Sequence, residues 1–77
     1  METMTVEVIC YGGHAAEVEP RALVVDGRRL EVVRIERRWQ EPESRGFVVR
    51  LAGGERCVLR QDVTSSTWTM ERAKGPG

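Results

Sequence analysis

The architecture of this chain follows from one stretch, Pro20-Arg21-Ala22-Leu23-Val24-Val25-Asp26-Gly27-Arg28-Arg29-Leu30-Glu31-Val32. Apolar and polar residues alternate on both sides of its central Asp26-Gly27 dipeptide. A two-residue Asp-Gly loop accepts the positive φ angles of a type I′ turn, and the twist of that turn matches the twist of paired strands. The stretch therefore predicts an antiparallel β-hairpin.

The second strand of this hairpin changes phase along its length. Leu30 and Val32 share one face, whereas Val33 and Ile35 share a face further on. A β-bulge at Val32-Val33 would produce this change and would bend the strand. We expect the strand to continue to Trp39, because a long bent strand is how a small barrel closes.

The remaining chain repeats a pattern of short alternating segments separated by turn residues. The further strands are expected at residues 5–11, 45–51, 55–61 and 67–72, with 12–19 as a connector and 40–44, 52–54 and 62–66 as loops or turns. The residues expected to face inward are Val6, Val8, Cys10, Phe47, Val49, Leu51, Cys57, Leu59, Trp68 and Met70. The pattern is typical of an all-β protein, here a small six-stranded antiparallel barrel or a highly curved sheet. Trp39, Phe47 and Trp68 are expected to supply much of the stability, since burying one large side chain contributes about 1.5–3 kcal/mol.

Size and charge limit the classes of function. A chain of 77 residues forms a single domain, with residues 4–72 as its core and 73–77 as a flexible tail. Such a chain buries only about 60% of its unfolded surface, which leaves little room for a deep active-site cavity. Lys and Arg number 12 and Asp and Glu number 12, so there is no overall positive field toward nucleic acid. Because the core is too small for a deep active site, we expect a protein that is not an enzyme.

The two cysteines, Cys10 and Cys57, lack the spacing of a metal site, and neither has a second cysteine or histidine in the right place. We expect no metal, no cofactor and no contact with a membrane, because no apolar run is long enough to span one. A cytoplasmic location is expected, where thiols stay reduced. The sequence leaves open whether Cys10 and Cys57 lie close together.

Residues 20–72 resemble an uncharacterised bacterial family of small β domains. The shared elements are the strand led by Pro20, Asp26-Gly27-Arg28, Val32-Val33, Trp39, Phe47-Val48-Val49-Arg50, Leu59, Asp62, Trp68 and Met70-Glu71-Arg72. Val25 and Leu30 stand where the family tends to have aromatic residues, and Cys57 replaces a more polar residue. Members of this family stand alone or follow mutagenesis proteins related to Y-family DNA polymerases. The resemblance implies a link to DNA repair or damage tolerance and supplies no catalytic residue.

Arginines are the main candidates for a binding site, because a guanidinium binds phosphate or carboxylate through two parallel hydrogen bonds. The candidate residues are Arg28, Arg29, Arg37, Arg38, Arg50, Arg56 and Arg60, with Tyr11 as the aromatic expected to face outward. Arg50, Arg56 and Arg60 are expected on one outer surface. There they face either Glu31 or Glu36 of the neighbouring strand, or a nucleic acid or acidic protein.

These residues favour a non-catalytic interaction module that binds protein or nucleic acid through an arginine-rich sheet face, and the family resemblance implies that the module is an accessory domain linked to DNA repair. One alternative is a small enzyme built on Cys10 and His14, with Gly12-Gly13 as backbone donors. Another is a structural domain that forms a homodimer through its first strand, residues 5–11, which either closes the barrel or stays a free edge.

Overall fold

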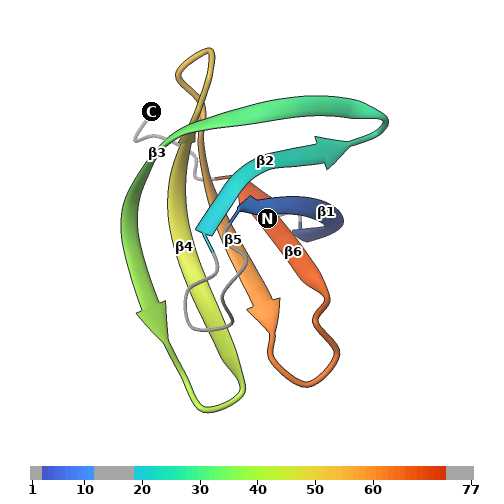
Figure 1. The fold of residues 1–77 in the computed structure, drawn as a ribbon, viewed down its shortest axis with the longest axis vertical. Coiled ribbons are helices and arrows are strands. Elements are labelled where there is room, and N and C mark those ends of the chain that lie inside the picture. Colours follow the sequence, from blue (N-terminus) through green and yellow to red (C-terminus); the bar gives the residue numbers. More distant parts are fainter. Residues whose placement is uncertain (1–2, 12–18, 73–77) are drawn as a thin grey trace.

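The computed structural model describes residues 3–11 and 19–72, which form a closed antiparallel barrel. Its strands follow chain order around the barrel, and the first pairs with the last (Figure 1). They are β1 (Thr3–Tyr11), β2 (Glu19–Val25), β3 (Arg28–Gln40), β4 (Ser44–Leu51), β5 (Arg56–Asp62) and β6 (Trp68–Arg72). This confirms the six-stranded barrel expected from the sequence. The predicted tail 73–77 and most of the predicted connector lie outside the described residues.

The Asp26-Gly27 turn joins β2 to β3 as predicted. Asp26 has a φ of 50° and Gly27 a φ of 76°, so both central residues adopt the left-handed conformation of a type I′ turn. Val25 pairs with Arg28 directly across it. The glycine is required here because its positive φ would strain a residue with a side chain.

Strand β3 pairs first with β2 and then with β4, and it bends sharply between the two paired segments (Figure 1). It pairs with β2 from Arg28 to Glu31 and with β4 from Val32 to Gln40. The register with β4 shifts between Val32 and Arg34, where the sequence predicts a bulge, and again between Ile35 and Arg37. The prediction that Val33 shares a face with Ile35 is wrong, since Ile35 packs against the core. Val33 is 60% exposed, because a bulge leaves its extra residue outside the pairing.

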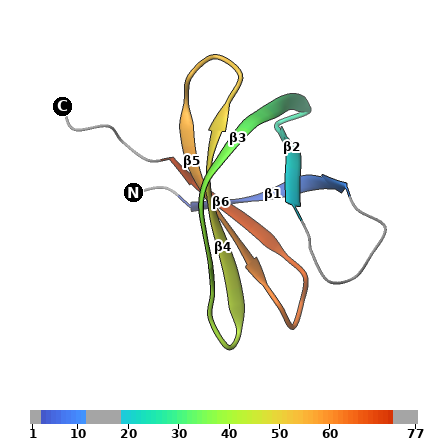
Figure 2. The same cartoon turned by 60° about the vertical axis from the view of Figure 1, so that its left-hand side comes forward.

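Strand β1 closes the barrel, which is one of the two arrangements that the sequence allowed. Residues 3–6 pair with β6, and residues 7–11 pair with β2. The result is a barrel in which β2, the end of β1 and the start of β3 lie on one side of the longer strands β3–β6 (Figure 2). Dimerisation through this strand stays a prediction, but pairing already occupies one side or the other of β1 along its length.

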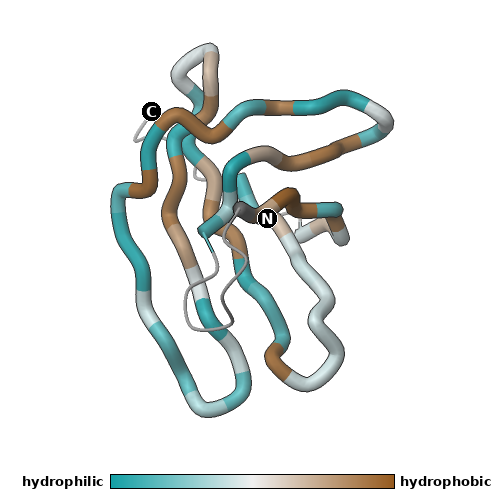
Figure 3. The backbone as a smooth tube through the Cα atoms, in the orientation of Figure 1, coloured by the Kyte–Doolittle hydropathy of each residue, from teal (hydrophilic) through white to brown (hydrophobic). Residues whose placement is uncertain are grey.

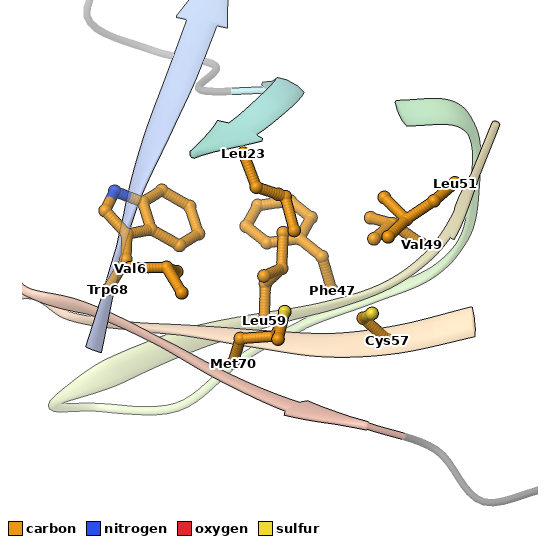
Figure 4. Packing of buried hydrophobic residues seen from close by; sticks show 9 residues of the cluster. All are labelled: Val6, Leu23, Phe47, Val49, Leu51, Cys57, Leu59, Trp68 and Met70. Carbon is orange, nitrogen blue, oxygen red and sulfur yellow. The ribbon is translucent and has the colours of Figure 1, made fainter. Parts of the chain in front are cut away.

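The core lies between these two parts of the barrel, as the colouring of the chain by hydropathy indicates (Figure 3). Leu23 enters from β2 and faces Phe47 and Leu59 of the larger sheet (Figure 4). The rings of Phe47 and Trp68 pack with their centroids 5.8 Å apart. The residues predicted to face inward on β4, β5 and β6 are all buried, so alternation along these strands was interpreted correctly.

Trp39 is the exception among the three aromatic residues expected in the core. It is half-buried and does not belong to the core cluster. Its partner across the β3–β4 ladder is Gly46, which lies on the face opposite to the inward Phe47 because side chains alternate along a strand. The tryptophan therefore lies on the outer face of the barrel.

Replacing Trp68 with alanine should destabilise the domain by about 3–5 kcal/mol, the usual cost of removing a buried tryptophan from a packed core. The measurement is chemical denaturation followed by circular dichroism. Val63→Ala is the control, because Val63 is 44% exposed. A Trp68→Ala denaturation midpoint that shifts no further than this control would show that Trp68 does not anchor the core.

Candidate functional site

Arg50, Arg56 and Arg60 lie on one outer surface of the barrel, as the sequence predicts. Strands β4 and β5 pair without a register shift, and Arg50 stands directly opposite Arg56. Arg60 follows Arg56 by four residues and therefore shares its face. The predicted grouping of the three arginines on one face is confirmed. Whether they can bind a ligand depends on the carboxylates that lie near them.

Glu36 forms ion pairs with two of these three arginines. Its carboxylate accepts a hydrogen bond from Arg50 Nε at 2.9 Å and forms an ion pair with Arg56 Nε at 2.8 Å. The Glu36 side chain is only 21% exposed. The hydrogen bond from Arg50 lowers the pKa of Glu36, and the positive charges of Arg50, Arg56 and Arg34 lower it further. Of the two outcomes left open by the sequence, internal pairing is the correct one for Arg50 and Arg56.

The paired arginines of β3 do not form one surface. Arg29, beside the turn, pairs with Glu31 at 2.6 Å, and Arg38 pairs with Glu19 of β2 at 3.2 Å. Arg37 and Arg38 lie on opposite faces of β3, because Arg37 stands opposite Val48 and Arg38 stands opposite the inward Phe47. The candidate set therefore divides into separate places on the barrel.

Arg37 and Arg60 remain available on the outer face. Among the described residues, no carboxylate forms an ion pair with either of them or with Arg28 at the hairpin tip. Gly46 of β4 pairs with Trp39 of β3 on one side and with Arg60 of β5 on the other. Arg37 precedes Trp39 by two residues, on the same face. We call this surface the Trp39 face; its residues are Arg37, Trp39, Val48, Val58 and Arg60.

The ring of Trp39 lies across Gly46 because that position has no side chain. A Cβ atom on Gly46 would meet Trp39 Cε2 and Cζ2 and would lie 2.8 Å from Cη2. One side of the indole thus packs against the β4 backbone, and Gly46 itself is buried beneath it. Sequence reasoning missed this platform and treated Tyr11 as the aromatic that faces outward. Gly46 occupies an outward-facing position of β4 and stands opposite Trp39 across the short loop that joins β3 to β4. That pairing could have indicated that Trp39 packs on the outer face.

Cys10 is the candidate nucleophile of the alternative enzyme. The residue is partly buried and packs against the core. Burial raises the pKa of the Cys10 thiol, and the positive charge of Arg45 opposes part of that rise. A raised pKa leaves less of the reactive thiolate at neutral pH. His14, Gly12-Gly13 and the side chain of Tyr11 lie outside the described residues.

Two further searches concern the described residues alone. No three His, Cys, Asp or Glu side chains in residues 3–11 and 19–72 gather closely enough to hold a metal ion. The same part of the chain contains no helix with the length and apolar character needed to cross a membrane. Comparison of the chain with protein-family models, curated proteins and solved structures gave no match. The resemblance to the small β domains associated with mutagenesis proteins stays an expectation.

Glu36→Gln should destabilise the barrel at neutral pH, because Arg50 and Arg56 lose their shared charge partner. The pKa of Glu36 is lowered in the folded state, so its contribution is complete above the unfolded value of about 4.3. The contribution is lost as the pH falls through the lowered folded pKa. Urea denaturation from pH 7 down to pH 3 should show the two proteins converging in stability. A gap that stays constant over this range would contradict the ion-pair role.

Iodoacetamide should alkylate Cys10 more slowly at pH 7 than it alkylates free cysteine, since the raised pKa leaves less thiolate. Arg45→Gln should slow the reaction further by removing the charge that favours the thiolate. Arg28→Gln, at the distant hairpin tip, is the control. Peptide mapping by mass spectrometry follows each cysteine separately. Alkylation faster than that of free cysteine would revive the enzyme hypothesis.

Proposed function

We propose that this protein is a non-catalytic binding module whose Trp39 face holds single-stranded nucleic acid. The observation that carries the proposal is the position of Trp39, whose ring covers Gly46 on the outer sheet beside two arginines without carboxylate partners among the described residues. Proteins that bind single strands combine cationic groups along the backbone with aromatic rings on which bases stack. The Trp39 face offers both elements on one surface.

The charges of the molecule favour a weak and local contact. The chain has no net charge, and Glu36 already occupies Arg50 and Arg56. Binding to phosphate would depend on Arg37 and Arg60, with the apolar Val48 opposite Arg37 and Val58 opposite Val48 on the same face. An exposed duplex offers phosphates but no unstacked base to Trp39, so the proposal favours single strands.

The resemblance of residues 20–72 to domains associated with mutagenesis proteins supports a role in DNA repair or damage tolerance. In that role the module would assist a larger assembly rather than act alone. The two cysteines are free in the structure, which fits the reducing cytoplasm, where such an assembly would work.

Fluorescence anisotropy with a labelled oligothymidylate of about eight to ten nucleotides tests the proposal. We expect a Kd of about 10⁻⁴ to 10⁻⁵ M at low salt, the range of non-specific binding. With two phosphate contacts, log K should fall against log salt with a slope of about −1.4, at ~0.7 per contact. The duplex of the same sequence should bind more weakly.

Three variants locate the contact. Trp39→Leu keeps an apolar side chain over Gly46 and should weaken binding about tenfold, because stacking contributes ~1–3 kcal/mol per base. Arg37→Gln combined with Arg60→Gln should flatten the salt dependence. Arg28→Gln removes a comparable unpaired charge outside the face and should change neither quantity. Wild-type protein that fails to bind at low salt would refute the proposal.

A further inference from the structure

The wall of the barrel is incomplete between β2 and β3. Strand β3 leaves β2 after Glu31, and its remaining residues pair with β4 alone among the described residues. Strand β2 likewise pairs with β1 alone at Pro20 and Glu19. The second half of β3 therefore presents a free edge, with backbone groups available to another strand.

A groove of about 270 Å³ runs along this edge. Its lining is mainly polar, and its apolar residues include Val32 and Ile35, which also pack against the core, and the buried Pro20. Val33 lines the same groove and is 60% exposed. An extended segment placed here would gain both backbone hydrogen bonds and apolar contact, the two contributions on which strand addition depends.

The charged lining of the groove is predominantly positive. Three arginines, Arg21, Arg34 and Arg38, line the groove together with one carboxylate, Glu19, and Arg34 also acts on Glu36 through its charge. Glu19 forms ion pairs with Arg38 of β3 at 3.2 Å and with Arg21 of β2 at 3.9 Å. A side-chain ion pair thus crosses the groove close to where backbone pairing between β2 and β3 is absent. Because all of these side chains are exposed or partly exposed, an incoming carboxylate can compete with Glu19 for its partners at little cost.

We propose that the free edge of β3 between Val33 and Arg38 accepts an extended acidic segment of a partner protein as an added strand. Alternate side chains of the segment would contact the apolar lining, and its carboxylates would pair with Arg34 and Arg38. This site is separate from the Trp39 face, since Arg37 and Arg38 lie on opposite faces of β3. The proposal therefore does not depend on binding of nucleic acid.

The probe is a labelled peptide of about eight residues that alternates valine and glutamate, the length of a short strand. Fluorescence anisotropy measures its affinity for the full chain. Two other peptides serve as controls, one with lysine in place of glutamate and one with prolines that prevent strand pairing. We expect the acidic peptide to bind and both controls to bind at least tenfold more weakly.

Variants of the groove separate charge from shape. Glu19→Gln removes the carboxylate that pairs with Arg38 and should tighten binding of the acidic peptide about threefold, the effect of one exposed ion pair. Arg38→Glu should weaken it by a larger factor. Val33→Glu places a carboxylate at the edge and should also weaken binding. Val63→Glu, at another exposed valine outside the groove, is the matched control and should have no effect.

Amide hydrogen exchange identifies the edge directly. The edge consists of those backbone amides of residues 33–38 that point away from β4, since the others pair with β4. Adding the acidic peptide should slow exchange of these edge amides. Equal binding of the lysine peptide, or unchanged exchange of the edge amides, would overturn the proposal. So would edge amides that are already protected without peptide: in a dimer by sedimentation they would assign the edge to a second copy, and in a monomer to this chain itself. Oligothymidylate that protects these amides instead would assign the groove to nucleic acid.

Discussion

The bend in β3 is the constraint on which the rest of the barrel depends. One strand of 13 residues serves first as the partner of β2 and then as the partner of β4, and it can do so only by turning between them. Two shifts of register permit the turn, since a bulge adds a residue to one strand and increases its local twist. The two parts of the barrel that enclose Leu23, Phe47 and Leu59 are joined through this bend.

The same bend sets the positions of the charged groups. The second irregularity, between Ile35 and Arg37, leaves Glu36 outside the pairing with β4, and its side chain reaches both Arg50 on β4 and Arg56 on β5. Beyond it, alternation along the strand places Arg37 and Arg38 on opposite faces, so one contributes to the Trp39 face and the other to the groove beside β2. The bend and the alternation that follows it thus distribute the arginines among a cluster paired with Glu36 and two places that remain open to ligands.

Much of the fold could be predicted because it depends on local signals. The type I′ turn at Asp26-Gly27 and the inward residues of β4, β5 and β6 follow from turn chemistry and from alternation with a period of two. Alternation failed where the period is interrupted, so Val33 and Trp39 were placed on the wrong face. The ion pairs of Glu36 and the groove at Glu19 depend on which strands meet across the barrel. That information is contained in the register of the whole sheet rather than in any one segment.

Trp39 and Gly46 form a complementary pair across the β3–β4 ladder. The indole can cover the sheet only while position 46 lacks a side chain, and the bare backbone of that position is covered only while a large ring stands opposite. The two positions are therefore not free to vary independently during evolution. Among diverged descendants of this domain, a larger residue at 46 should accompany a smaller one at 39. Loss of the platform should therefore be visible as two linked substitutions in the same sequence.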